Sequence, residues 1–443
     1  MLLLTRGLDR SRGLAESLPP STHKLLAELG VLQDVEQAGF YRSTGNTVHW
    51  ASNAPRVESF GGQLGYQVYR PDLDRVLCDS AARAGVEIRD HARVADVRFD
   101  SDGVHVACDG GGTVDGRLVI DASGRTGVIG RQYRRSQPGF RTCALVGVWQ
   151  RDRWDLPDPT HTVVETFERG WAWSVPISPT VRHVGVMVGR AGSYRHEVKN
   201  TLTIRRLVEG AVLQHTFACD ASLYDVVRYA GSRFLLVGDA GSFIDPLSSC
   251  GVKKALASAW VGAIAANTVL RDPARRGAVV DFVNRWERGV YADHLRRSRD
   301  FSAKAMRAHP HPFWEARAAV ELDAEDDSGE IHAAFERIRS ASSIEFALAE
   351  NVRVEPQPVI RGREIVLEDA FMLAGHRLSR CGDAGLRYAD NVDLLRLAKV
   401  ACRYPRVPDV YEAYCRATDA APLPNVISGL SLLVAKGILH ART

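Results

Sequence analysis

The strongest chemical pattern in the chain is "FLLVGDAGSFIDPLSSCGVKKAL", residues 234–256. Apolar residues lead into Gly238 and Asp239, which predicts a buried strand, a glycine-rich turn and then a helix from Val252. Ligands of open α/β sheets bind at the carboxyl ends of strands, so Asp239 could accept hydrogen bonds from a polyol there. The free N–H groups at the helix start suit a ring carbonyl oxygen or an anion. The same pattern also fits a plain strand, turn and packed helix with a solvated Asp239.

A second pattern is "GWAWSVPI", residues 170–177. Trp171 and Trp173 are two residues apart, and alternate side chains of a strand share one face. We therefore expect the two rings to pack together as a wall on a half-buried strand.

These residues need a frame of strands and helices to position them. The chain opens on an apolar strand at Leu2–Leu4, and helices are predicted up to about Leu29 and from about Asp72 to Ala84. Alternating strands follow, and residues 131–230 are rich in strand patterns. From about residue 310 the chain reads as mostly helical, with a possible hairpin near "PQPVIRGREIVLED".

This order predicts an α/β fold in which a nucleotide-binding domain is divided by an inserted antiparallel β-sheet domain. The expected ranges are 1–130 and 231–305 for the first domain and 131–230 for the β-rich substrate domain, with 40–65 contributing. Residues 306–443 form the expected helical C-terminal region.

Composition narrows the class of protein. A net charge of +4 over 443 residues favours neither nucleic acid nor an acidic membrane surface as a partner. No apolar run reaches the roughly 20 residues that span a bilayer, and no signal peptide pattern is present, which predicts a cytoplasmic protein. The eight cysteines are scattered without metal-ligand spacing, so no metal site is expected.

The residues of the first pattern resemble the flavin-contacting motif of the flavin-dependent halogenase and FAD-dependent monooxygenase superfamily (tryptophan-halogenase-like). Four further segments resemble that superfamily in the same order: "ESLPPS" (16–21), "YRPDLDRVLCDSAARAGVEI" (69–88), "VIDASGRTGVIGR" (119–131) and "GWAWSVPI". The last is similar to the halogenase WxWxIP signature, with Val175 in place of Ile. The resemblance covers roughly residues 1–305 and implies FAD bound by a Rossmann-type domain of glutathione-reductase-like fold.

The resemblance also implies roles for particular residues. Those expected to bind the cofactor are Ser17, Arg70, Val94, Asp121, Gly124, Gly238, Asp239, Pro246, Gly251 and Val252. Those expected at the catalytic site are Arg42, Ser43, His49, Trp171 and Trp173. The tryptophan pair would flank the space between flavin and substrate. His49 and Arg42 lie on the segment that connects the two domains, although His49 also fits an ordinary core or surface imidazole.

The chain departs from the family pattern at its start. It has no GxGxxG turn to hold the FAD pyrophosphate, and Leu2–Leu4 resembles the family's second strand. We expect about 30 residues of the family pattern to be missing, through truncation or natural variation. As written, the chain is then expected to bind FAD poorly, and a submicromolar affinity in an FAD titration would contradict this.

A second departure concerns the halogenase lysine, which the resemblance places in a segment like "GFxxKxGAxF". Here the segment is "GFYRSTGNTVHW", residues 39–50, and the lysine position falls on Ser43, with Arg42 beside it. Lys253 and Lys254 are interpreted as solvated or phosphate-facing charges on the helix after the flavin loop.

The resemblance without the lysine implies a monooxygenase that uses reduced flavin and O2 to hydroxylate an aromatic, indole-like substrate, free or bound to a carrier or peptide. A flavin reductase or NAD(P)H would supply the electrons. The alternatives are a halogenase with a displaced lysine, a flavin reductase of prenyl double bonds, and a non-catalytic flavoprotein remnant.

Overall fold

The computed structural model describes residues 1–7, 13–52, 54–190, 192–322, 328–372, 385–417 and 421–442. It consists of two compact units. Unit 1 comprises Met1–Ala266 and Trp286–Val320, and unit 2 comprises Asn267–Arg285 and Glu321–Thr443. Each unit is described by itself.

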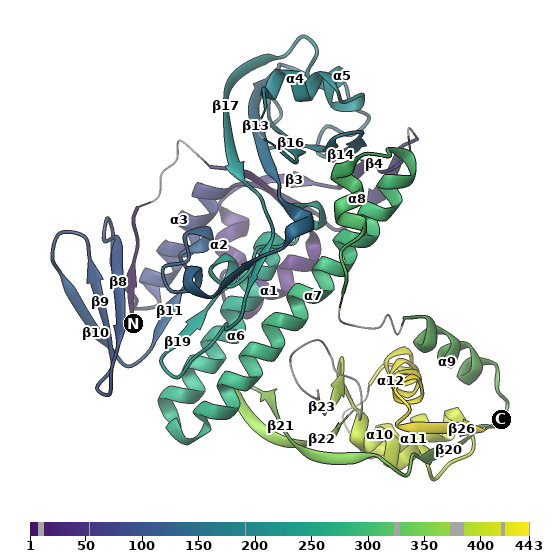
Figure 1. The fold of residues 1–443 in the computed structure, drawn as a ribbon. Coiled ribbons are helices and arrows are strands. Elements are labelled where there is room, and N and C mark those ends of the chain that lie inside the picture. Colours follow the sequence, from purple (N-terminus) through teal and green to yellow (C-terminus); the bar gives the residue numbers. More distant parts are fainter. Residues whose placement is uncertain are drawn as a thin grey trace. The chain divides into compact units, whose positions relative to one another are not determined.

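Unit 1 contains two small sheets that each consist of two parallel strands. β1 (Leu2–Leu4) pairs with β7 (Glu87–Arg89), and β11 (Val119–Asp121) pairs with β19 (Phe234–Leu236). Two long helices follow β19 in the chain, α6 (Gly251–Arg271) and α7 (Arg276–Ala308), and the end of α6 and the start of α7 belong to unit 2. They run side by side in Figure 1, and a hydrogen bond from Ser258 of α6 to Glu287 of α7 joins them.

Unit 1 also contains a small antiparallel sheet with the strand order β2 (Ala15–Leu18), β6 (Gly65–Tyr69) and β3 (Tyr41–Ser43), in which β6 is the central strand. One face of it packs on α1 (His23–Glu28), α2 (Leu32–Gln37) and α3 (Arg70–Arg83). Leu18, Tyr66 and Val68 are buried there together with Val252 and Leu256 of α6. The start of α6 is thereby fixed against the small sheet.

The largest sheet of unit 1 has seven strands in the order β17-β13-β16-β15-β14-β4-β5. Their ranges are β4 Gly45–His49, β5 Arg56–Ser59, β13 Cys143–Gln150, β14 Thr162–Phe167, β15 Gly170–Pro176, β16 Val181–Val188 and β17 Val212–Asp220. The strands β13 to β17, within residues 131–230, pair antiparallel with one another, whereas β4, from outside that range, pairs with β14 in parallel. β4 reaches the sheet from the N-terminal part of the chain, and its direction is therefore not set by a hairpin.

Alternation along these strands divides the sheet into two faces. One face packs on α4 (Tyr194–Lys199) and α5 (Thr203–Val208) through Leu145, Val184 and Val186, and both helices lie against this sheet in Figure 1. The other face buries Trp171 and Met187 with residues of α7 and of α8 (Pro312–Ala318). This second face is the one that carries the predicted tryptophan wall.

Two further sheets complete unit 1. β8 (Val94–Phe99), β9 (Val104–Cys108) and β10 (Thr113–Gly116) form a three-stranded meander, and β12 (Arg134–Ser136) pairs with β18 (Tyr224–Val226).

Unit 2 has a core of its own between helices and short strands. Its helices are α9 (Ser328–Ser340), α10 (Leu394–Ala401), α11 (Val407–Ala417) and α12 (Leu423–Ala435). Its strands are β20 (Glu345–Leu348), β21 (Arg353–Arg361), β22 (Glu364–Met372), β23 (Gly385–Leu386), β24 (Tyr388–Ala389), β25 (Val392–Asp393) and β26 (Leu439–Arg442).

The prediction of a helical region over 306–443 is therefore corrected to a mixed region. The hairpin expected near "PQPVIRGREIVLED" is present as β21 and β22, which join at Gly362 with φ of 57°. β20 and β26 pair although they are far apart in sequence. The residues of either strand alone therefore do not predict this pairing.

Among the residues that the structure describes, no helix is long and apolar enough to cross a membrane. In the same part of the chain, no group of His, Cys, Asp and Glu side chains is arranged to hold a metal ion.

Candidate functional site

Asp239 lies directly after the buried strand β19, on a single 3-10 turn, Gly238–Ala240. Gly238 has φ of 61°, a left-handed conformation that favours glycine. Burial raises the pKa of Asp239, while the positive charges of Lys254, Arg70 and Arg125 act in the opposite direction. The carboxylate is half-buried, so the alternative of a plainly solvated aspartate does not describe it.

The Lys254 side chain stabilises this turn through hydrogen bonds to its backbone. Its ammonium group donates to Gly238 O at 2.7 Å and to Ser242 O at 2.5 Å, and the residue is 4% exposed. Burial lowers the pKa of Lys254, and the negative charges of Glu287 and Asp239 oppose this. The interpretation of Lys254 as a solvated charge is therefore wrong. Lys253, by contrast, donates to Ser21 Oγ at the surface, at 3.0 Å.

A buried chain of hydrogen bonds continues from the same turn. The Gly238 N–H donates to Ser258 Oγ at 2.9 Å, and the Ser258 hydroxyl donates to Glu287. Glu287 is 2% exposed, and burial raises its pKa. Lys254, Ser258 and Glu287 therefore fix the backbone that presents Asp239.

Asp121 shapes the neighbouring turn at the end of β11. Its carboxylate accepts from Ser123 N (3.0 Å), Ser123 Oγ (2.6 Å), Ile129 N (2.7 Å) and Gly130 N (3.1 Å). A Cβ on Gly130 would lie 2.1 Å from Ala240 O, so this position must lack a side chain for the two turns to meet. Asp121 thus holds the loop that packs against the Asp239 turn.

Glu16 and Arg70 lie near Asp239, and sequence analysis did not identify Glu16. Arg70 Nε donates to Asp74 Oδ1 at 2.7 Å. Burial raises the pKa of Glu16, the positive charge of Arg70 lowers it, and the negative charges of Asp239 and Asp74 raise it. Ser17, the residue chosen from the sequence, is buried opposite Gln67 and points to the other face of β2.

The remaining residues expected to bind the cofactor lie at different places. Gly124 lies in the β11 turn with φ of 65°, and Pro246 follows Asp245, whose carboxylate accepts from Leu247 N at 3.1 Å. Gly251 and Val252 begin α6, and the Val252 side chain is buried in the core beneath the small sheet. Val94 begins β8, outside the strand pair that carries Asp121 and Asp239.

Trp171 and Trp173 lie in contact on β15, with ring centroids 5.4 Å apart. Trp171 is buried and Trp173 is half-buried. Trp173 fits only because residue 185 is glycine, since a Cβ there would lie 2.0 Å from its ring. Trp50 and Trp314 extend the aromatic cluster on this face, 5.8 Å apart.

Arg42 and Ser43 lie on β3 and point to opposite faces, as neighbouring strand residues do. The Arg42 guanidinium lies over the Tyr66 ring, 4.2 Å from its centroid. Ser43 is 1% exposed, and its hydroxyl donates to Gly45 O at 3.0 Å. The two side chains therefore do not share one cavity.

His49 ends β4 and pairs in register with Glu165 of β14. Glu165 is itself committed to the backbone, because its carboxylate accepts from Leu202 N, Thr203 N and Ile204 N at 3.2, 2.9 and 2.6 Å. Glu165 therefore caps the start of α5.

His183 is a buried imidazole on the tryptophan face that sequence analysis did not identify. It is 4% exposed, lies 5.9 Å from the Tyr69 ring centroid, and its Nδ1 has no hydrogen-bond partner among the described residues. Burial, with the nearby His215, lowers the pKa of His183 from the ordinary 6.5 to about 4. The ring is therefore neutral at physiological pH.

We expect this histidine to make the protein sensitive to acid. Because the folded state binds its proton more weakly than the unfolded state, its stabilising effect is full above pH 6.5 and is lost as the pH falls toward 4. Between pH 7 and pH 5, His183 should account for about 2 kcal/mol of lost stability. Urea unfolding at both pH values should show a smaller loss for His183→Phe than for the parent. An unchanged loss in His183→Phe would contradict the assignment.

Comparison with solved structures places the fold among flavin-dependent enzymes. The structure of CmlS, a flavin-dependent halogenase, superposes with a TM-score of 0.81 over 99% of this chain and 90% of that chain, at 22% identity. The peptidyl tryptophan dihydroxylase QhpG superposes with a TM-score of 0.68 over 98% and 93%, at 21% identity. The α/β fold predicted from the sequence is thus that of the FAD-dependent halogenases.

The family model for tryptophan halogenase matches residues 27–347, so the chain belongs to the tryptophan halogenase family. It is 26% identical to the tryptophan 2-halogenase of Chondromyces crocatus over 306 residues, 63% of this chain and 58% of that protein. It is 25% identical to the 1H-pyrrole-2-carbonyl-[peptidyl-carrier protein] chlorinase of Pseudomonas fluorescens over 295 residues, 56% of this chain and 66% of that protein. The chain thus spans about 60% of the length of these two relatives.

The resemblance seen in the sequence is confirmed by these matches. The family consists of flavin-dependent oxidoreductases, and FAD is its cofactor, as the motifs predicted.

Proposed function

We propose that this chain is an FAD-dependent monooxygenase that hydroxylates an aromatic, indole- or tryptophan-like substrate, free or attached to a carrier protein or peptide. Electrons would come from a flavin reductase or NAD(P)H. The observation that carries the proposal is Ser43. At the position where the family resemblance puts the halogenase lysine, the structure has a buried serine whose hydroxyl is bonded to Gly45 O. A serine can neither form a chloramine nor donate a charged hydrogen bond.

The residues around Asp239 fit the polyol part of FAD. Asp239 and Glu16 offer carboxylate acceptors beside the Arg70 guanidinium, and burial raises the pKa of both carboxyl groups. Gly238 and Gly130 let backbone approach closely at the same turns. We propose that Asp239, Arg70 and Glu16 hold the cofactor in a glutathione-reductase-like domain. Gly251 and Val252 would contribute backbone N–H groups from the start of α6.

Reduced FAD, when bound, supplies the electrons that activate O2 for transfer of one oxygen atom to an electron-rich ring. The task of this chain is then to orient the ring and to exclude water. Trp173 suits that task, because its half-buried ring is held in contact with the buried ring of Trp171. The similarity of the fold to a peptidyl tryptophan dihydroxylase is consistent with hydroxylation.

Halogenation is the second candidate, and the names of the relatives favour it. Because residue 43 is serine, halogenation would require a lysine elsewhere in the chain. Lys254 is committed to two backbone carbonyls, and Lys253 donates to Ser21. Neither contact is with the tryptophan wall.

Product mass separates the two candidates. The chain would be incubated with FAD, a flavin reductase, NADH, chloride or bromide, and tryptophan, indole or a tryptophan-containing peptide. We expect gain of one oxygen atom that carries the label when isotopically labelled O2 is used. Replacement of hydrogen by halogen, without oxygen gain, would overturn the proposal in favour of the second candidate. Asp239→Ala serves as the control for uncatalysed oxidation by free reduced flavin.

Restoring the halogenase residue tests the environment of position 43 directly. Ser43→Lys would place a charge at a site that is 1% exposed, so we expect it to destabilise the protein by about 2–4 kcal/mol rather than to give a halogenase. Thermal unfolding and product mass measure the two effects. Ser59→Lys on the exposed end of β5 is the matched control and should leave the melting temperature unchanged. A stable, halogenating Ser43→Lys variant would show that position 43 opens to the substrate.

A further inference from the structure

Unit 1 carries a concentrated positive charge on the two helices that cover its large sheet. Residues 190–210, which contain α4 and α5, hold five Lys and Arg residues and two Glu residues. Their net charge is +3, whereas the whole chain of 443 residues carries +4. We refer to four exposed side chains of these helices as the basic surface: Arg195 and Lys199 of α4, and Arg205 and Arg206 of α5.

The packing of α4 and α5 directs the basic surface away from the sheet. The inner sides of the two helices are buried in the core of the sheet, through Tyr194, Val198, Ile204 and Leu207. Both helices lie against the same sheet in Figure 1, so their exposed sides form one outer surface. A hydrogen bond from Arg205 Nη1 to Lys199 O, at 3.4 Å, joins the end of α4 to α5.

The fold does not neutralise these charges. Within the part of the chain that the structure describes, none of the four side chains forms an ion pair. The carboxylate of α4, Glu197, is 2% exposed and lies 3.4 Å from Arg169 instead. Arg195 and Lys199 are four residues apart, and like charges at this spacing destabilise a helix. The counter-charges of the basic surface must therefore come from solvent ions or from a partner.

Two exposed apolar side chains accompany the charges. Leu202 precedes α5 and is 39% exposed, and Val212 follows α5 and is 62% exposed. The Ala211 N–H donates to Val208 O at 3.0 Å, which keeps the chain before Val212 at the end of the helix. Protein interfaces combine apolar contacts with a polar, charged rim, whereas contacts to nucleic-acid phosphates need no aliphatic side chain. The combination favours a protein partner.

We propose that the basic surface docks an acidic protein, whose carboxylates pair with the four cations and whose apolar side chain contacts Leu202. Opposite charges on the two partners would also speed their encounter. This docking does not depend on the proposed function.

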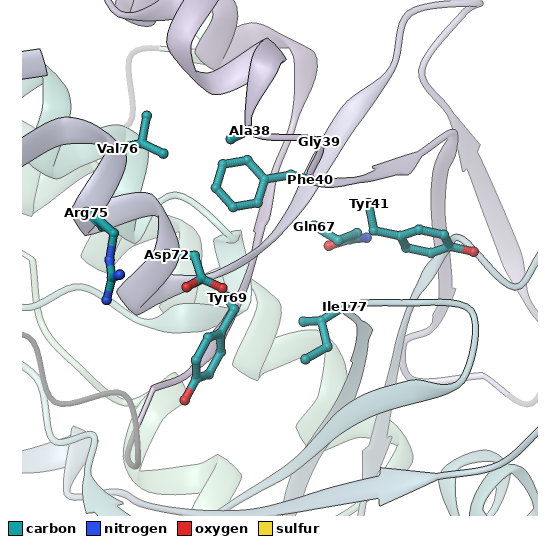
Figure 2. Close-up of a pocket in the computed structure, with 10 residues that line it drawn as sticks. All are labelled: Ala38, Gly39, Phe40, Tyr41, Gln67, Tyr69, Asp72, Arg75, Val76 and Ile177. Atoms are coloured by element: carbon teal, nitrogen blue, oxygen red, sulfur yellow. The ribbon is translucent and has the colours of Figure 1, made fainter. Parts of the chain in front are cut away.

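The basic surface is also separate from the pocket of about 360 Å³ shown in Figure 2. The side chains labelled there come from β3, β6, α3, the chain after α2 and the loop after β15, and none comes from α4 or α5. A small molecule in that pocket would not occupy the docking surface.

The experiment measures binding of a fluorescent helical peptide to the full chain by anisotropy. The peptide carries many Glu side chains and one row of Leu side chains, and a second peptide has Gln in place of every Glu. We expect only the acidic peptide to bind, and to bind more weakly as salt is added, because exposed charges are screened. Equal binding of the two peptides, or no binding of the acidic peptide at millimolar concentration, would overturn the proposal.

A charge variant locates the binding. Arg195→Gln/Lys199→Gln/Arg206→Gln removes three cations whose side chains make no hydrogen bond with other described residues, so the fold should be retained. We expect the acidic peptide to bind about tenfold more weakly, which is the combined effect of three exposed ion pairs. Unchanged affinity in this variant would show that the peptide binds elsewhere and would contradict the assignment.

Two further comparisons separate docking from general attraction. The control Lys24→Gln/Arg297→Gln/Arg307→Gln removes the same charge from other exposed positions of unit 1 and should bind like the parent. An equal loss in this control would mean that only net charge matters. Leu202→Ser should weaken binding of the acidic peptide about threefold, since it removes an apolar contact. Tighter binding of a DNA duplex than of the peptide, unaffected by Leu202→Ser, would assign the surface to nucleic acid and overturn the proposal.

Discussion

Lys254→Met is expected to lower the free energy of unfolding by about 3 kcal/mol, because it removes two charge-assisted hydrogen bonds and leaves their acceptors buried. Those acceptors are Gly238 O and Ser242 O, at the two ends of the turn that presents Asp239. The buried carboxyl group of Glu287 also loses the positive charge that opposes the rise in its pKa. Urea unfolding at pH 7 measures the effect.

The control is the neighbouring lysine. Lys253→Met removes a surface hydrogen bond to Ser21 and should change stability by no more than about 0.5 kcal/mol. The double variant Lys254→Met/Glu287→Gln should lose less than the sum of the single variants, because the two charges act on each other. A Lys254→Met variant as stable as the parent would mean that the ammonium group is not held at these carbonyls.

Asp239→Ala is expected to weaken FAD binding by about 10- to 100-fold. A hydrogen bond to a charged group contributes about 1.5–3 kcal/mol, and tenfold in affinity corresponds to 1.4 kcal/mol. The half-buried carboxylate lies beside Arg70 and Glu16, so its loss removes an acceptor from the proposed polyol site. Titration of FAD into parent and variant, followed by flavin fluorescence, measures the ratio even where the parent binds weakly.

Two variants sharpen this result. Asp239→Asn keeps the size and one acceptor of the side chain, and we expect it to fall between parent and Asp239→Ala. Asp96→Ala, at an exposed position on β8, should bind FAD like the parent. Equal FAD affinity of Asp239→Ala and parent would remove this carboxylate from the proposed cofactor site.

The features that sequence analysis predicted well are those with a local pattern. The apolar run before Gly238 and Asp239 forms the buried strand and turn, and the spacing of Trp171 and Trp173 brings the two rings into contact. The hairpin of β21 and β22 also follows from its own residues.

The features that it missed depend on partners distant in sequence. Whether Lys253 or Lys254 points inward is decided by carbonyls of the preceding turn and by Glu287 on another helix. Strand alternation could have distinguished Glu16 from Ser17, but only once the face of β2 toward Arg70 was known. The sequences of β4 and β14 do not predict that the two strands pair in parallel, because no hairpin turn joins them.

That pairing limits how the large sheet can be engineered. A fragment spanning residues 131–230 would lack β4 and β5 and would leave β14 as an unprotected edge strand, a template for aggregation. Residues 45–59 must therefore accompany the central segment in any transplant, circular permutation or chimaera. During synthesis, β4 leaves the ribosome more than 100 residues before its partner strand, which makes the sheet a late, long-range event in folding.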